Sequence, residues 1–286
     1  MLHSKRWRCT TGCNRIGAAI EVPEAMIMFA ANRPQPSMPK KRSFFSKVIL
    51  LLLIVAAVVL VNYFRTHENP FTKRAHAPKP GFPEIEHKQE PREIVFDGCP
   101  PEGDGGDPEL NRLKNRVDEG KYLSVDFGVL IDISWPRDIE RERRGRWSQS
   151  DREDVEQYEG TPVSVEGYLA GAKEEGPESP NCHGEEGEMR DFHLWLVKNA
   201  DDDRSQSMVV EVTPRIRKDH PRWDLDDIRK LVKDGRHVRV SGWLMLDPEH
   251  PDQVGKTRGT IWEIHPIMKI EVENHGAWKA LDDIAA

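Results

Sequence analysis

Apolar and polar residues alternate along three successive segments in the second half of the chain. In Thr161–Ala170 every second residue is apolar or glycine, which is the two-residue period of a half-buried strand. Asp191–Val197 repeats this alternation, and Met208–Thr213 is short and rich in β-branched residues, which favour strands. We therefore predict three consecutive strands.

The period then changes once, from that of a strand to that of a helix. Apolar residues in Pro221–Lys233 recur at helical spacing and form one stripe, and Gly235 follows as a stop signal. The stripe consists of Leu225, Ile228, Leu231 and Val232. Alternation returns in Arg236–Leu246 and in Thr260–Val272. The predicted order is three strands, one helix and two strands.

This order of elements is similar to that of the OB-fold, a small closed β-barrel. The similarity also includes the segments Asn181–His183, Gly242–Pro248 and Arg258–Pro266. It covers residues 161–273 of the 286 and resembles OB-like domains of uncharacterised bacterial membrane-anchored or exported proteins. The resemblance implies a mainly β fold with a helix, a five-stranded barrel that binds ligands on its second and third strands. It implies no catalytic residues.

A second strong pattern lies nearer the N-terminus. Residues 44–64 contain the apolar run Val48–Val61, with Lys40–Arg42 before it and Arg65 after it. About 20 apolar residues span a bilayer, and basic residues ahead of the span keep its N-terminal side in the cytoplasm. We predict a single-pass anchor in the inner (cytoplasmic) membrane with a periplasmic C-terminal domain. The competing interpretation is a cleaved signal peptide, although no small-residue cleavage pattern follows the run.

The remaining residues divide into four segments around the anchor and the barrel. These are a disordered cytoplasmic tail at 1–43, a linker at 65–91, a mixed helical and strand extension at 92–160, and a C-terminal tail at 274–286. Met38 stands directly before a basic stretch and is the expected start of the chain. The extension should pack on the barrel, because alone it offers little core.

Within the extension, three elements are predicted. Asp107 followed by proline should begin a helix that ends near Val117. The apolar residues of Tyr122–Trp135 favour a strand, and the highly charged Asp138–Tyr158 favours a helix.

Charge is divided unequally along the chain. Residues 1–77 carry 12 basic and 3 acidic residues, so 30 basic and 46 acidic residues remain for 78–286, a net charge of −16. Proteins that grip phosphate backbones do so through basic surface. Nucleic acid is therefore a disfavoured partner. The membrane, through the anchor, and a small ligand, peptide or envelope component are the partners that the sequence favours.

Histidine, carboxylate and tryptophan residues on the predicted strands are the candidate site. The ligand-binding set is His193, Trp195, Glu211 and Trp243, and the metal-binding set is His183, His193, Glu263 and His265. Imidazole and carboxylate groups together suit a divalent transition metal, zinc especially. The alternative is that the histidines hydrogen-bond strand edges, because no metal-binding spacing is present.

Two cysteines, Cys99 and Cys182, follow the predicted anchor. An oxidising compartment permits a disulfide between them, which would join the extension to the first loop of the barrel. The alternative is two free thiols, one of them a metal ligand.

Three function classes stay open at this point. A membrane-tethered extracytoplasmic binding module needs no cofactor and is favoured over an enzyme. A hydrolase would use the histidine–carboxylate set to hold zinc and activate a water molecule. A nucleic-acid binder is the third class and conflicts with the acidic charge of residues 78–286.

Overall fold

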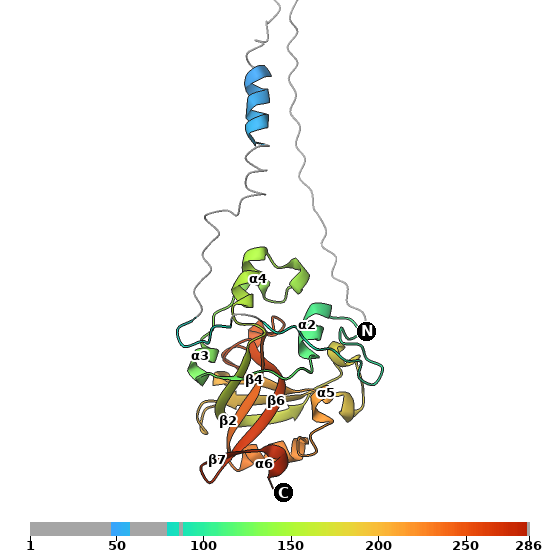
Figure 1. Ribbon diagram of the computed structural model, residues 1–286, viewed down its shortest axis with the longest axis vertical. Helices are drawn as coiled ribbons and strands as arrows, with labels where there is room; N and C mark the ends of the chain where they lie inside the picture. Colours follow the sequence, from blue (N-terminus) through green and yellow to red (C-terminus); the bar gives the residue numbers. More distant parts are fainter. Residues whose placement is uncertain (1–46, 58–78, 86–87, 285–286) are drawn as a thin grey trace, which may run out of the picture. The chain divides into compact units, whose positions relative to one another are not determined.

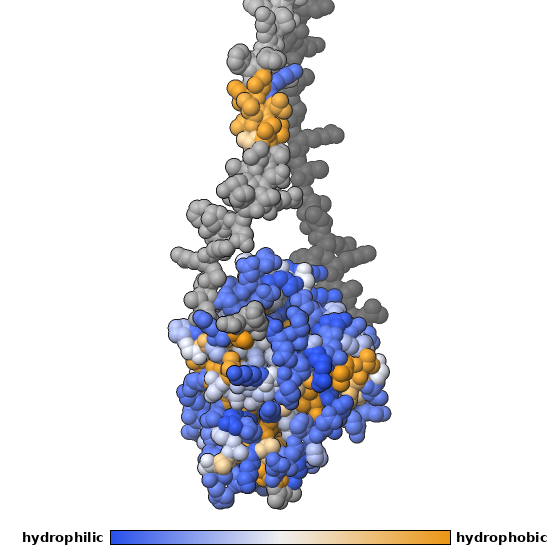
Figure 2. Space-filling view, viewed as in Figure 1, coloured by the Kyte–Doolittle hydropathy of each residue, from blue (hydrophilic) through white to orange (hydrophobic). Residues whose placement is uncertain are grey.

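The computed structural model describes residues 47–57, 79–85 and 88–284, which belong to two units, residues 1–66 and 67–286. In the first unit, residues 47–57 form a helix with exposed apolar side chains, coloured as hydrophobic in Figure 2. Among the described residues, no helix is both long enough and apolar enough to cross a membrane. The rest of the predicted anchor, the tail at 1–43 and most of the linker at 65–91 lie outside the described residues.

The second unit is built on a closed five-stranded β-barrel with helices around it (Figure 1). Its elements are β2 (Pro162–Glu174), β3 (Phe192–Val197), β4 (Met208–Val212), α5 (Pro214–Arg217), α6 (Leu225–Lys233), β5 (His237–Leu246) and β6 (Trp262–Asn274). Antiparallel pairs join β2 to β3, β3 to β4, β5 to β6, and β5 to β2, while β4 pairs with β6 in parallel. The predicted barrel is therefore confirmed, and its order is consistent with an OB-like barrel.

The barrel interior is filled by the apolar face of each strand. Val165, Leu194, Val210 and Ile264 are fully buried members of one hydrophobic core. Close approach between strands requires glycine at Gly242, because a Cβ there would lie 2.3 Å from the carbonyl oxygen of Pro266. The β5–β6 register shifts at the same place, so the glycine lets the two strands coil tightly.

Helix α6 packs against β2 and begins at Leu225, the first residue of the stripe, rather than at the start of the predicted segment Pro221–Lys233. Asp224 is the N-cap, and its side chain accepts the Asp227 N–H at 2.7 Å. The helix ends just before Gly235, which adopts a φ of 56° that a residue without a side chain accommodates readily.

The extension is folded onto the barrel and contains α2 (Pro108–Lys114), β1 (Leu123–Ser124), α3 (Phe127–Ile131) and α4 (Gln149–Glu156). Its apolar residues, among them Leu130, Ile133 and Val155, belong to the same core as the barrel strands. The helix predicted at Asp107 is present. The strand predicted over 122–135 is wrong for most of its length, because Asp126 caps a helix with its side chain and β1, paired with β2, is two residues long.

The predicted C-terminal tail contains a further strand, β7 (Ala277–Ala280), which pairs with the end of β6. The connections between elements contain short 3-10 helices at Arg137–Ile139, Arg144–Arg146, Ser179–Asn181, Gly187–Met189, Arg204–Gln206, Pro251–Gln253 and Leu281–Asp283. Two of these connections, β2–β3 and β5–β6, carry residues of the site described below.

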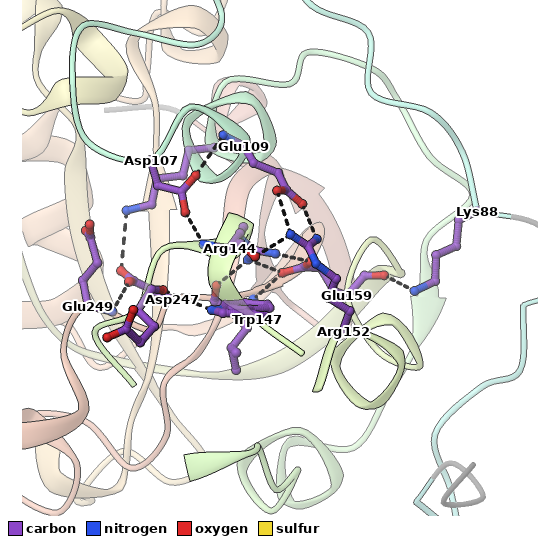
Figure 3. A network of polar contacts seen from close by, with 12 residues as sticks. Lys88, Asp107, Glu109, Arg144, Trp147, Arg152, Glu159, Asp247 and Glu249 are labelled. Carbon is purple, nitrogen blue, oxygen red and sulfur yellow. Dashed lines mark hydrogen bonds and ion pairs between the residues drawn. The ribbon is translucent and has the colours of Figure 1, made fainter. Parts of the chain in front are cut away.

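A buried polar network fixes the extension to the barrel (Figure 3). Both terminal nitrogens of Arg144 donate to the Glu159 carboxylate at 2.6 Å, and Nη2 also donates to the Leu246 carbonyl at 2.8 Å. Glu159 Oε1 accepts the Leu246 N–H at 3.0 Å. Asp107, the N-cap of α2, accepts the Arg144 N–H at 2.6 Å. The network therefore links α2, the loop that holds Arg144 and the end of β5.

A disulfide between Cys99 and Cys182 joins the extension to the β2–β3 connection, the pairing that the sequence permitted. The Cα atoms of the two residues are 5.7 Å apart, within the usual range for this bond. Beside it, the buried Arg215 donates to the side chain of Asn181 and to the carbonyl of Cys99. This end of the β2–β3 connection is thus held by covalent and polar contacts.

Candidate functional site

The two faces of strands β3, β4 and β6 have opposite chemistry. Leu194, Val210 and Ile264 point into the barrel core. Successive side chains on a strand alternate, so the residues on either side of each of these three point outward. His193 lies opposite Glu211 in the β3–β4 pair. Val209, two residues before Glu211, lies beside Glu263 in the β4–β6 pair. One outer face therefore gathers polar residues from three strands.

These outward-facing residues are buried although they lie outside the barrel. His193 and Glu211 are about 6% and 5% exposed, and Glu263 and His265 are fully buried. Helix α2 and the β2–β3 and β5–β6 connections cover the face, since residues from all three border the same cavity. In OB-folds the two corresponding loops and this face receive ligands.

The cavity has a volume of about 590 Å³. Apart from the aromatic Trp195, it is lined by charged and polar side chains, which are Lys114, Lys173, Glu175, Glu178, His193, Arg204, Glu211, Asp247, Glu249, His250, Asp252, Gln253, Lys256, Thr257 and Arg258. Small-molecule sites usually measure about 300–1,000 Å³. The space is therefore large enough for a small ligand, and its lining contains both acids and bases.

His193 is held at the cavity wall by a carboxylate. Its Nδ1 lies 2.7 Å from Glu175 Oε1 and 3.5 Å from Glu211 Oε1, and its ring packs on Trp195 with centroids 4.7 Å apart. Burial lowers the pKa of His193, and the hydrogen bond to Glu175 opposes that shift in part. A neutral His193 that donates its Nδ1–H to Glu175 presents the lone pair of Nε2.

The carboxylates next to His193 differ in charge preference. Burial would raise the pKa of Glu263, but Arg258, whose Nη1 lies 2.5 Å from Glu263 Oε1, lowers it, and together with His265 and Lys114 it outweighs burial. Burial and repulsion from Glu263 raise the pKa of Glu211 well above its usual value. His265 Nδ1 lies 3.3 Å from Glu211 Oε2 and 3.8 Å from Glu263 Oε2. Glu263 is thus a fixed anion, and Glu211 lacks a comparable cation.

Lys114 of α2 brings a positive charge to the same region. Its Nζ lies 3.5 Å from Asp247 Oδ2, and both side chains are almost fully buried. Burial lowers the pKa of Lys114, but four carboxylates, those of Asp247, Glu211, Glu178 and Glu263, together outweigh burial, so that the pKa is raised well above its usual value. Lys114 therefore keeps its charge.

Several polar atoms of this cluster have no hydrogen-bond partner among the residues that the structure describes. They are both carboxylate oxygens of Asp191, His193 Nε2, Glu211 Oε2, Glu263 Oε2 and both ring nitrogens of His265. A buried polar group without a partner costs about 1–3 kcal/mol. Such groups are rare in native proteins unless a ligand, ion or water engages them.

The structure brings most of the predicted site residues together and separates two of them. His193, Trp195 and Glu211 line the cavity, and Glu263 and His265 adjoin Glu211. His183 is exposed and does not line the cavity; its Nε2 lies 2.9 Å from the carbonyl of Asp104.

Trp243 is also placed away from the cavity. It is buried under the extension, where its Nε1 donates to the Asp118 carbonyl at 3.0 Å and Arg116 lies 3.4 Å from the ring centroid. Trp243 thus packs between the barrel and the extension.

Residues that sequence reasoning missed come from the segments that cover the face. Lys114 and Asp247 had no pattern to mark them, because the two residues are distant in sequence. The alternation of Asp191–Val197 placed Asp191 on the same face as His193, but it gave no reason to single Asp191 out. Arg258 stands in a segment that supported the OB resemblance, but its partner Glu263 became evident only from their contact.

A comparison of the chain with protein-family models finds no match, and neither does a comparison with curated proteins. The function is therefore inferred from the chemistry of the cavity and of the face beneath it.

Proposed function

We propose that this chain is a binding module that holds a small polar ligand in the cavity over β3, β4 and β6. The observation that carries the proposal is the set of buried, unpartnered polar atoms at and beside the cavity wall, among them His193 Nε2 and Glu211 Oε2. A ligand that supplied partners would recover about 1–3 kcal/mol for each atom. The position on an OB-like barrel supports the same function, because such barrels receive ligands there.

The charges around the cavity favour a ligand that carries both signs. Arg204 lies 4.0 Å from the centroid of the Trp195 ring, and it makes no ion pair with any described residue. It can therefore receive a carboxylate, while Trp195 offers an apolar face. On the inner side, the carboxyl groups of Glu175 and Glu211 line the cavity and can receive a cationic group. Amino acids and short peptides meet both requirements.

Thermal unfolding of the full-length chain tests this proposal. Zwitterionic amino acids and dipeptides should raise the melting temperature in a saturable way, whereas neutral sugars and inorganic phosphate should not. Arg204→Gln should weaken the effect about tenfold or more, because it removes a charged partner worth about 1.5–3 kcal/mol. Arg229→Gln is the matched control, since Arg229 lies exposed on α6. A shift produced by sugars or phosphate alone would assign a different ligand class, and no shift from any compound would reject the binding function.

A hydrolase is the second candidate, and the Glu175–His193 pair favours it. The carboxylate orients the imidazole so that Nε2 could accept a proton from water. The described residues that line the cavity include one hydroxyl group, that of Thr257, and no serine or cysteine. Water would therefore be the nucleophile. Incubation with dipeptides separates the two functions. Binding alone leaves the dipeptide intact, whereas cleavage that His193→Gln abolishes would establish the enzyme.

An extracytoplasmic location completes the proposal, with residues 44–64 as the membrane anchor and the barrel as a member of the OB-like domains of exported bacterial proteins. The basic residues before the apolar run and the Cys99–Cys182 disulfide support it, because disulfides persist in oxidising compartments. A reporter enzyme that requires disulfides should be active when fused after the barrel. An inactive fusion, with the same reporter active when it is exported behind an established signal sequence, would contradict this location.

A further inference from the structure

We propose that Asp191, Glu211 and His265 bind one divalent transition-metal ion, zinc above all, at the inner end of the cavity. This proposal deepens the proposed function. It rests on that function at one point, because Glu211 belongs both to the ligand cavity and to the metal site. Of the metal ligands predicted from the sequence, this set keeps His265. Asp191 and Glu211 take the place of His183, His193 and Glu263.

Three separate parts of the sheet bring the ligands together. Asp191 directly precedes β3, Glu211 lies within β4 and His265 lies within β6. One ligand atom from each side chain lies within 4.8 Å of the other two. His265 Nδ1 and Glu211 Oε2 are 3.3 Å apart. Two ligand atoms on a tetrahedral zinc ion with bonds of about 2.0–2.1 Å are also about 3.3 Å apart, so this pair already has a coordinating separation.

The three side chains are buried, and their converging atoms make no hydrogen bonds to the residues that the structure describes. Asp191 is about 1% exposed, Glu211 about 5%, and His265 is fully buried. Hydrogen-bond partners among the described residues are absent for both carboxylate oxygens of Asp191, both ring nitrogens of His265 and Oε2 of Glu211. Hydrogen bonding thus leaves unexplained why these polar groups converge in the interior. Lone pairs that converge on one point can be satisfied by an ion.

The cations near the cluster make their hydrogen bonds and ion pairs with other residues, although Arg215 and Arg217 also attract Asp191 from a longer distance. Arg258 pairs with Glu263 at 2.5 Å and Lys114 lies against Asp247. Arg215 donates to Asn181 and to backbone carbonyls. None of the three forms an ion pair with Asp191 or Glu211 in the part of the chain that the structure describes. Two carboxylates therefore share a buried volume with a histidine, and a divalent cation would balance their charge.

The ligand chemistry selects the class of ion. Magnesium and calcium prefer oxygen ligands throughout, whereas an imidazole with carboxylates suits zinc and other first-row divalent ions. Three protein ligands leave a further position on a four-coordinate ion. Because Glu211 also lines the cavity, a ligand held there can approach the ion from the cavity side. A bound amino acid would then meet the metal as well as Arg204.

Metal analysis of the full-length chain tests the site. The purified protein is stripped with a chelator, dialysed against micromolar zinc chloride, and analysed for zinc by mass spectrometry. We expect one zinc per chain. Asp191→Asn, Glu211→Gln and His265→Gln should each weaken zinc binding about tenfold or more, since even the loss of a residue that only orients a ligand costs about 10–100-fold. Cobalt should bind the native chain with the visible absorption bands of a four-coordinate ion.

A second acidic group near the cavity provides the matched control. Asp247, Glu249 and His250 also bring ligand atoms within 4.8 Å of one another, but Glu249 is exposed and His250 is half-buried. Glu249→Gln and His250→Gln should retain the zinc and the cobalt bands. Circular dichroism of each variant checks folding, and the zinc content of the native chain needs no variant at all. No zinc in the native chain would overturn the proposal. The proposal would also be overturned if His250→Gln lost the bound zinc while His265→Gln retained it.

The same preparations separate failure of the metal site from failure of the binding function. Zinc-free protein whose melting temperature still rises with amino acids would leave the binding module standing without its metal. Zinc-loaded protein that responds to no amino acid, dipeptide, sugar or phosphate would leave the metal site standing and reject the binding module.

Discussion

Replacement of Arg144 by methionine should destabilise the fold strongly. The Arg144 side chain is about 2% exposed and forms two hydrogen bonds of 2.6 Å to Glu159 (Figure 3). The variant keeps the Glu159 carboxylate buried and leaves it the Leu246 N–H as its remaining partner in the network. Removing one member of a buried ion pair costs about 3–5 kcal/mol. The loss is a large part of the total, because a folded domain is stable by about 5–15 kcal/mol.

A double-mutant cycle separates the pair from general disturbance of the core. Arg144→Met, Glu159→Met and the double variant are unfolded in urea, and the free energies are extrapolated to water. The double variant buries no unpaired charge, so its destabilisation should be smaller than the sum of the two single variants by about 0.5–3 kcal/mol.

The matched control is Arg146→Met, because Arg146 is exposed and pairs with Glu142 along the surface. Its effect should be within about 0.5 kcal/mol. The reasoning would be refuted by an Arg144→Met variant as stable as the control, or by single-variant losses that add without coupling.

Three further results are expected. Replacing both Cys99 and Cys182 by alanine opens a loop closed across 83 positions and should cost up to about 4.5 kcal/mol in the chain-entropy model; an unchanged urea midpoint would contradict this. Gly242→Ala would place a Cβ 2.3 Å from the Pro266 carbonyl oxygen and should cost about 1–3 kcal/mol, whereas Gly176→Ala, which meets nothing within 4 Å, should be tolerated. Burial raises the pKa of Glu178 from 4.5 to about 7, so the folded state holds this proton more tightly and stability contributed by Glu178 declines as pH rises from about 4.5 to about 7. The melting temperature of Glu178→Gln should therefore rise relative to that of the native chain as the pH increases across that window. A constant difference between the two melting temperatures would exclude Glu178 as the cause of the pH dependence.

Some elements of this fold could be predicted because their residues signal them locally. The alternation in 161–170 reports a strand with one buried face, whatever it packs against. The stripe of Leu225, Ile228 and Leu231 reports a helix in the same way. The apolar run at 122–135 misled, because its length fits a buried strand and a short capped helix equally well.

The candidate site was predictable only in part, for a related reason. Strand alternation placed His193 and Trp195 on one face, and it marked Glu211 as the charge within its strand. It could not reveal that His265 lies against Glu211, because that contact depends on the parallel β4–β6 pairing that closes the barrel. The strand pattern also could not show that the extension covers Trp243.

The sequence by itself determined the periods of the strands and the helix, the acidic charge of residues 78–286 and the pair of cysteines available for a bond. The tertiary structure alone decided that α2 and two barrel connections cover the polar face and that Asp191, Glu211 and His265 converge there. The physical reason is the separation in sequence between the residues that interact. A period reports whether one side of an element is buried, whereas convergence of side chains depends on strand pairing and chain closure between residues far apart in sequence.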